Sequence, residues 1–149
     1  MDVRLTPKDL EILKYLRNDA RQTLTQLSRK TKIPVSTLFD RLRNYEKSMI
    51  IRHASLLNFS KLGYNARAQM FFKFSMMHKD VARSFFSNHP QINSVYLLSN
   101  DYDYSVDGIF ENVCDVKNFV EDVEKRFSPT EQKVIFVAEE LQKEGFLSK

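Results

Sequence analysis

One predicted helix carries a set of polar and basic side chains with the chemistry of DNA recognition. Leu38, Leu42 and Tyr45 follow one another at spacings of four and three, which predicts a single apolar stripe. The outward positions carry hydroxyl, carboxylate and guanidinium groups, which can meet base edges and phosphates in a major groove. The alternative is the solvated polar face of an ordinary small helical domain. We predict DNA contacts, with Arg41 the foremost, from Ser36, Thr37, Asp40, Arg41 and Arg43.

The sequence offers little for catalysis. Its histidines, His53, His78 and His89, are widely separated and lack the spacing of metal ligands. It contains no serine-nucleophile elbow, phosphate-binding glycine loop or helical zinc motif. The single cysteine, Cys114, has no obvious activating neighbour, and we expect it to be a small buried residue near a helix start. We therefore expect neither an enzyme nor a bound metal or cofactor.

Charge is unevenly distributed along the chain. Residues 1–61 carry 13 Lys and Arg against 6 Asp and Glu, whereas residues 62–149 carry 10 against 13. This asymmetry indicates a part that faces nucleic acid joined to a part with another task. No stretch approaches the ~20 apolar residues that span a bilayer, and the first residues hold no apolar signal region. We expect a globular protein of the cytoplasm that associates with the nucleoid and has no membrane partner.

Capping residues mark the helices of the first part. Thr6, followed by proline and an acidic residue, predicts one helix start, and Thr23 predicts the next. Pro34 favours the start of a third helix, the one with the polar face, which Ser48 ends. Residues 49–57 are β-prone at their start and suit the hairpin of a winged helix-turn-helix. Arg52 in that hairpin would contact a phosphate.

The pattern of the second part changes from helical spacing to strict alternation. In the expected helix over residues 79–88 we place Val81, Phe85 and Phe86 inward. The complete order, β-α-β-β-α-β, is that of a ferredoxin-like domain with helices on one sheet face and the other face free to pack on a partner. Its elements are a strand over 66–76, the helix over 79–88, strands over 92–98 and 102–109, a helix over 112–127 and a strand over 133–137.

The order and spacing of four motifs resemble those of the Lrp/AsnC, or feast/famine, regulators along essentially the whole chain. LTPKDLEILKYLRNDAR is similar to the first helix of that family, and RKTKIPVSTLFDRLRNYE to its turn and recognition helix. LLNFSKLGY resembles its linker, which ends in Leu-Gly. SNDYDY, residues 99–104, is similar to the family's Gly-Asp-Tyr-Asp turn between two strands.

The resemblance implies an α+β, sequence-specific transcriptional regulator that binds double-stranded DNA. Residues 1–57 would form a winged helix-turn-helix DNA-binding domain, 58–65 a linker and 66–149 a ferredoxin-like oligomerisation and effector domain. The family dimerises through the C-terminal domain and often assembles further, to a tetramer or octamer. A small molecule such as an amino acid would bind near Asn100, Asp101 and Asp103.

The sequence departs from the family pattern in three places: the helix-turn-helix turn, the start of the wing and the effector turn. Lys32 stands where a glycine is usual in the helix-turn-helix turn, and Pro34 where a serine cap is usual. Ser48-Met49 lacks the glycine expected before the wing, and Asn100 replaces a glycine whose missing side chain leaves room for an effector. A ligand-insensitive, architectural DNA-binding protein is therefore one alternative. A sirohaem-decarboxylase-like enzyme on the same scaffold is another.

Overall fold

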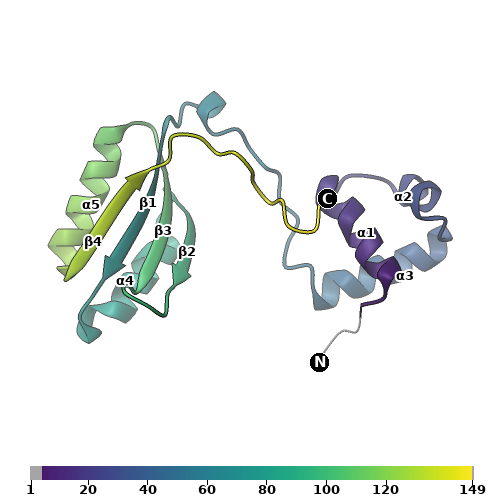
Figure 1. Ribbon diagram of the computed structural model, residues 1–149, viewed down its shortest axis with the longest axis horizontal. Coiled ribbons are helices and arrows are strands. Elements are labelled where there is room, and N and C mark those ends of the chain that lie inside the picture. Colours follow the sequence, from purple (N-terminus) through teal and green to yellow (C-terminus); the bar gives the residue numbers. More distant parts are fainter. Residues whose placement is uncertain (1–4, 149) are drawn as a thin grey trace. The chain divides into compact units, whose positions relative to one another are not determined.

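The chain forms two compact units. The computed structural model describes residues 5–148 (Figure 1). Leu57–Glu140 form one unit, here the sheet unit, and the rest of the described chain forms the other, the helical unit. The elements in order are α1 (Pro7–Asn18), α2 (Leu24–Thr31), α3 (Val35–Ser48), the short 3-10 helix η1 (Ser60–Leu62), β1 (Ala66–Lys73), α4 (Met76–Asn88), β2 (Ile92–Leu97), β3 (Tyr104–Phe110), α5 (Val113–Phe127) and β4 (Glu131–Phe136).

The first two helices begin where their capping residues predict. The Asp9 N–H donates to the Thr6 hydroxyl at 3.3 Å, and the Thr6 N–H donates to the Asp9 carboxylate at 2.8 Å. Thr23 and Gln26 form the same reciprocal pair at the start of α2. These bonds satisfy N–H groups that have no partner within the helix, so each start is fixed locally.

The turn between α2 and α3 forms with a lysine in place of the usual glycine. Lys32 takes a left-handed conformation with φ of 59°. The Ser28 hydroxyl donates to the Ile33 carbonyl at 2.6 Å and holds the turn closed. A left-handed lysine costs on the order of 1 kcal/mol. The turn, the start of α3 just after Pro34 and its end at Ser48 match the sequence prediction.

The C-terminal residues belong to the helical unit. The Arg17 guanidinium donates to the Glu144 carbonyl at 2.9 Å and pairs with its carboxylate at 3.0 Å. The Asn18 amide donates to the Ser148 carbonyl at 2.7 Å. The division into 1–57, 58–65 and 66–149 stays a prediction, although the structure groups the residues after Glu140 with the helical unit.

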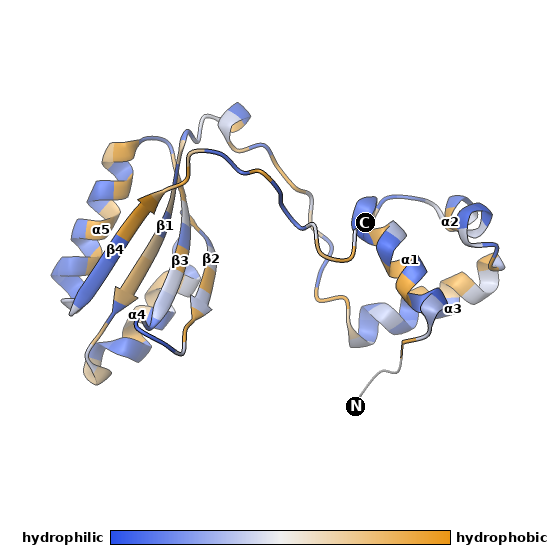
Figure 2. Ribbon diagram, in the orientation of Figure 1, coloured by the Kyte–Doolittle hydropathy of each residue, from blue (hydrophilic) through white to orange (hydrophobic). Residues whose placement is uncertain are grey.

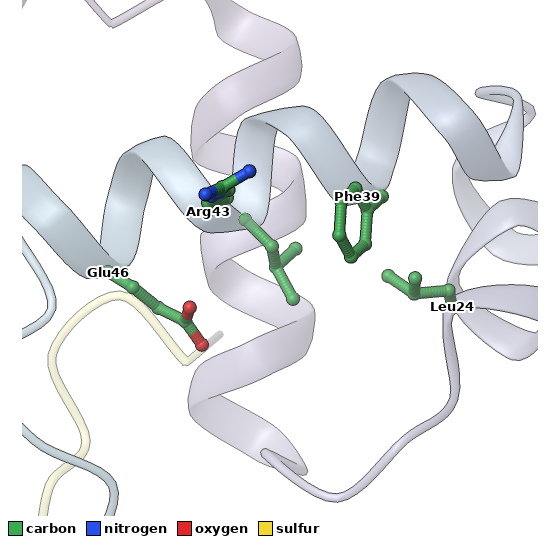
Figure 3. A pocket seen from close by; sticks show the side chains of 5 residues that line it. Leu24, Phe39, Arg43 and Glu46 are labelled. Carbon is green, nitrogen blue, oxygen red and sulfur yellow. The ribbon is translucent and has the colours of Figure 1, made fainter.

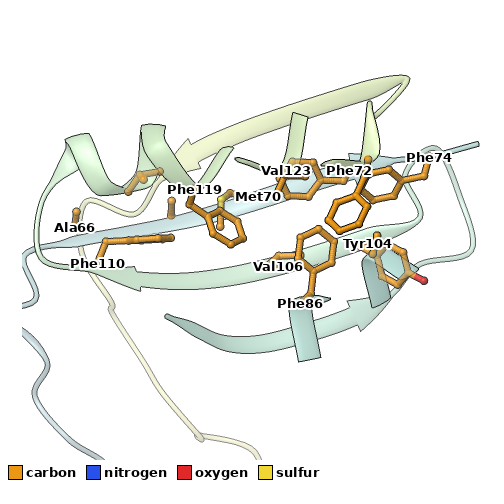
Figure 4. Close-up of a cluster of buried hydrophobic side chains, with 14 residues drawn as sticks. Ala66, Met70, Phe72, Phe74, Phe86, Tyr104, Val106, Phe110, Phe119 and Val123 are labelled. Carbon is orange, nitrogen blue, oxygen red and sulfur yellow. The ribbon is translucent and has the colours of Figure 1, made fainter. Parts of the chain in front are cut away.

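The sheet unit has the predicted ferredoxin-like order. Its antiparallel sheet runs β2-β3-β1-β4, so β1 lies between β3 and β4. Side chains of α4 and α5 pack with those of β1 and β3 in a single core (Figure 4). The core is rich in aromatic rings; Phe72 stacks on Phe86 with ring centroids 5.3 Å apart. Gly108 makes room for this packing, because a Cβ there would lie 2.4 Å from the Phe110 ring.

The first strand ends earlier than the alternation predicts. Beyond Lys73 the Phe74 N–H donates to the Asp103 carboxylate at 2.9 Å instead of to a neighbouring strand, so the ladder stops there. Met76, which the sequence analysis placed at the end of the strand, begins α4 together with Met77, and the two are 94% and 80% exposed. Within α4, Phe86 is buried as expected, but Val81 faces solvent.

The prediction of a hairpin over residues 49–57 is wrong. The Ile50 N–H donates to the Tyr45 carbonyl at 2.8 Å, which completes the end of α3. Residues 51–57 then form no strand, and Ile51 is almost fully exposed. A β-prone segment needs a neighbouring strand to pair its backbone groups, and the described chain supplies none here.

Candidate nucleic-acid interface

The outward face of α3 is polar and free of internal partners. Leu38 and Tyr45 are buried on the opposite side of this helix. The exposed residues recur at spacings of three and four, so they follow one line along the helix. Within residues 5–148 their side chains form no hydrogen bond or ion pair. This line, the α3 outer row, consists of Ser36, Asp40, Arg43 and Lys47.

The structure sorts the predicted contact residues into two groups. Ser36, Asp40 and Arg43 lie in the α3 outer row, and the exposed Thr37 is next to it. Arg41 is instead drawn toward α1. The sequence analysis missed Lys47, although the same spacing extended by one turn points to it.

Arg41 is held by an acidic residue of α1. Its Nη1 lies 2.5 Å from Oδ1 of Asp9, and the two side chains are 32% and 13% exposed. The Tyr45 hydroxyl donates to the same carboxylate oxygen. The other oxygen of Asp9 accepts the Thr6 N–H at the start of α1. One carboxylate thus caps α1 and anchors two side chains of α3.

The ionisation of this cluster follows from its contacts. Burial opposes the charge on Asp9, but hydrogen bonds from Thr6 and Tyr45 and the charge of Arg41 outweigh it and lower the pKa of Asp9 to about 2. Burial, together with the bond to Asp9, raises the pKa of Tyr45 to about 12. At neutral pH the carboxylate is therefore charged and the phenol protonated.

An apolar groove runs beside the α3 outer row. Phe39 and Leu24 point toward each other across it, from α3 and from the start of α2 (Figure 3). Leu42, Arg43 and Glu46 complete its lining. Phe39 is 54% exposed although it is a large aromatic residue. The sequence analysis did not single out Phe39. Its position could have been noticed, because it is a bulky apolar residue outside the apolar stripe of the helix.

Arg52 lies in the strandless segment after α3. Its side chain is exposed and makes no hydrogen bond or ion pair within residues 5–148. It is therefore free to meet a phosphate, although the hairpin in which we placed it does not form.

The predicted effector residues have different surroundings. Asp103 is occupied within the fold, because its carboxylate accepts the Phe74 N–H and lies 2.5 Å from Lys79 Nζ. Burial opposes its charge, but these contacts outweigh burial and lower the pKa of Asp103. Asn100 and Asp101 are exposed in the turn between β2 and β3. The structure thus leaves two of the three available to a ligand.

Comparison with known proteins finds relatives among transcriptional regulators. Residues 5–52 match the family described as winged helix-turn-helix DNA-binding. The chain is 29% identical over 122 residues to the HTH-type transcriptional regulator FL11 of Pyrococcus horikoshii, which covers 81% of each protein. It is 28% identical over 124 residues to the leucine-responsive regulatory protein of Rhizobium meliloti, covering 79% of this chain and 78% of that protein. The resemblance of the chain to the Lrp/AsnC regulators therefore extends over most of its length.

A solved structure shares the Lrp/AsnC fold. A transcriptional regulator from Neisseria meningitidis, solved in complex with L-Met, matches with a TM-score of 0.86 at 20% identity over 93% of both chains. The predicted fold class, a helix-turn-helix part followed by a ferredoxin-like part, is therefore confirmed. The relatives named here are described as transcriptional regulators.

The other reactive groups of the described chain are scattered. Within the described residues no cluster of three or more His, Cys, Asp or Glu could hold a metal ion. Cys114, expected to be buried, is exposed. His89 packs between the rings of Phe85 and Phe119, and burial lowers its pKa. None of the described helices has the length and apolar character needed to cross a membrane.

Proposed function

We propose that this protein recognises a specific DNA sequence with α3 in the major groove. The observation that supports this most is the α3 outer row, exposed and unpaired within a part of the chain that matches a DNA-binding family. Arg43 has the geometry for guanine or phosphate, and Ser36, Thr37 and Asp40 suit base edges. Arg52 would add a phosphate contact that contributes affinity but not specificity.

Phe39 would add a contact with an apolar group of a DNA base. It lies next to Arg43 on the groove, with a half-exposed ring supported by Leu24. The C5-methyl group of thymine is the apolar group that a major groove presents, and phenylalanine is among the side chains that contact it. We therefore assign Phe39 a thymine contact beside the bases contacted by the α3 outer row.

We further propose that the protein acts as a dimer through the sheet face that α4 and α5 leave uncovered. Within the described chain, Tyr96 and Ile135 on this face are 58% and 43% exposed. The end of β4 is also hydrophobic (Figure 2). At the centre, Arg67 donates to both oxygens of Asp107 at 2.8 Å. A partner can cover such a satisfied pair without leaving an unpaired charge.

Sedimentation velocity over a range of concentrations tests the assembly. We expect a dimer, extending to a tetramer or octamer, and weaker self-association for Ile135→Asp. A two-fold dimer would bind half-sites about 10 base pairs apart on one face of the duplex. A monomer at every concentration would contradict the proposal.

The exposed part of the turn between β2 and β3 is our candidate effector site. Asn100 and Asp101 are accessible there, and a carboxylate can bind the amino group of an amino acid. The Neisseria regulator was solved with L-Met, which makes amino acids the first class to test. Calorimetric titration with each amino acid should find one whose binding weakens in Asp101→Asn. Binding of none would favour the ligand-insensitive alternative.

Selection from a random-sequence duplex pool tests the regulator proposal directly. The full chain should enrich one motif with two-fold symmetry. Binding without enrichment would instead identify an architectural protein. Failure to bind any duplex at low salt, together with a Soret-band shift on adding sirohaem, would favour the enzyme alternative. A regulator of this kind would act in the cytoplasm, where the bacterial or archaeal chromosome lies.

A further inference from the structure

We infer that Arg41 is a positioning residue: with Asp9 and Tyr45 it sets the rotation of the recognition helix and does not itself contact DNA. This inference rests on the proposed function, since it assigns a role within DNA recognition. It also revises our sequence prediction, in which Arg41 was the foremost contact.

The geometry of the cluster gives Arg41 a fixed partner on another helix. Asp9 and Arg41 are separated by 32 positions in sequence, yet their charged atoms lie 2.5 Å apart. Asp9 is almost fully covered at 13% exposure, whereas Arg41 keeps 32%. Moving Arg41 to a phosphate would leave a covered carboxylate without its cation, which is unfavourable. The contact within the protein therefore competes with any contact to DNA.

Helical periodicity links this cluster to the DNA-facing residues. Arg41 and Tyr45 are four residues apart, so both project toward α1. Asp40 and Arg43 project from another side of the same helix and are exposed. The two bonds to Asp9 therefore fix how α3 is turned about its axis. A helix that loses them can rotate, and every contact of the α3 outer row then shifts together.

Replacing Asp9 should have different effects if Arg41 positions α3 and if Arg41 contacts a phosphate. If Arg41 bound a phosphate, Asp9 would compete for it, and Asp9→Asn would leave DNA affinity unchanged or raise it. If Arg41 positions α3, Asp9→Asn and Arg41→Ala remove the same connection. Both should then weaken specific binding, and the double variant should be little worse than either single one.

The experiment is a double-variant cycle read by fluorescence anisotropy on the selected duplex at several salt concentrations. It compares the wild-type chain with Asp9→Asn, Arg41→Ala and the double variant. Tyr45→Phe removes the hydroxyl that contacts Asp9 and Arg41 but leaves their ion pair in place. Asp80→Asn, an exposed residue of α4, controls for the loss of one negative charge. Circular dichroism at the titration temperature verifies that each variant is folded.

We expect Asp9→Asn and Arg41→Ala each to weaken specific binding about tenfold, the range of one well-placed contact. Tyr45→Phe should weaken it less, and Asp80→Asn should match wild type. The slope of log affinity against log salt should stay at the wild-type value in Arg41→Ala, because no phosphate contact is lost.

Two results would overturn the inference. One is a salt slope smaller by about 0.9 in Arg41→Ala, the signature of one lost phosphate contact. The other is wild-type affinity in Asp9→Asn together with weak binding in Arg41→Ala. Absence of specific binding by the wild-type chain is a separate outcome, because it overturns the proposed function and this inference with it.

Discussion

The helical unit and the sheet unit hold their elements together by different means. In the sheet unit, 14 buried apolar residues form one core with many ring contacts. In the helical unit, the described core has five buried members, Ile12, Leu27, Ile33, Leu38 and Tyr45. One of those five, Tyr45, also donates a hydrogen bond to the Asp9 carboxylate.

The difference shows where a polar contact can control geometry. A large aromatic core fixes the sheet unit by packing alone, so an ion pair on its surface changes little. Three short helices around a small core leave more freedom for one helix to turn. In that setting a partly buried carboxylate with several partners contributes substantially to the orientation of α3.

Truncating one buried ring of the sheet unit should have the largest effect. Phe72→Ala should lower the free energy of unfolding by about 3–5 kcal/mol, because it removes a fully buried side chain and leaves a cavity. Urea unfolding followed by circular dichroism measures this. Val81→Ala, at an exposed site on α4 of the same unit, is the control. A loss below about 1 kcal/mol for Phe72→Ala would contradict the importance of the aromatic core.

Acid should destabilise the helical unit through Asp9. Its pKa is about 2 in the folded protein and ordinarily 3.8, so folding is favoured by the charged form. The contribution, on the order of 2 kcal/mol, is complete above pH 3.8 and is lost as pH falls toward 2. Between pH 5 and pH 2, the thermal unfolding temperature of Asp9→Asn should therefore fall less with decreasing pH than that of the wild-type chain. An unchanged pH profile in that variant would show that Asp9 does not carry the effect.

Replacing the left-handed Lys32 should have a smaller effect, and it should stabilise the protein. Lys32→Gly should raise the free energy of unfolding by about 1 kcal/mol, because glycine takes φ near 59° without a Cβ penalty. Arg29→Gly, at an exposed position of α2, should be destabilising by about 1 kcal/mol and serves as the control. Destabilisation by Lys32→Gly would mean that the lysine side chain stabilises the turn.

Unlike the buried rings of the sheet unit, Phe39 should affect DNA recognition and not stability. Phe39→Ala should leave the unfolding free energy nearly unchanged, because the ring is half exposed. It should abolish the preference of the wild-type chain for thymine over uracil, about fivefold or less, at one position of the selected duplex. Anisotropy titrations on duplexes with single uracil replacements measure this. Equal sensitivity to uracil in both proteins would exclude the thymine contact.

Local signals in the sequence predicted most of the fold. Thr6, Thr23 and Asn112 each cap a helix where the residue types indicate, because capping depends on neighbours within a few positions. The β-α-β-β-α-β order followed from alternating and helical spacings. The start of α4 was misplaced by three residues and that of β3 by two, since a contact between residues 29 positions apart, Phe74 just after β1 and Asp103 just before β3, sets these bounds.

The candidate site was predicted only in part, for the same reason. The exposed positions of Ser36, Asp40 and Arg43 follow from helical spacing alone. The pairing of Arg41 with Asp9 joins two helices and has no local signal. Likewise, Asp103 resembles an exposed turn residue in sequence, but Lys79 and the Phe74 N–H occupy it in the fold.

Specific DNA binding by α3 is the central claim, and Arg43 tests it most directly. The measurement is an anisotropy titration on the selected duplex and on a scrambled duplex at two salt concentrations. We expect the wild-type chain to bind the selected duplex more tightly, with affinity that falls as salt rises, and Arg43→Ala to lose most of that preference. Arg83→Ala, an exposed arginine of the sheet unit, should bind like wild type. Equal binding of both duplexes by the wild-type chain, or an unchanged preference in Arg43→Ala, would contradict the assignment of α3 as the recognition helix.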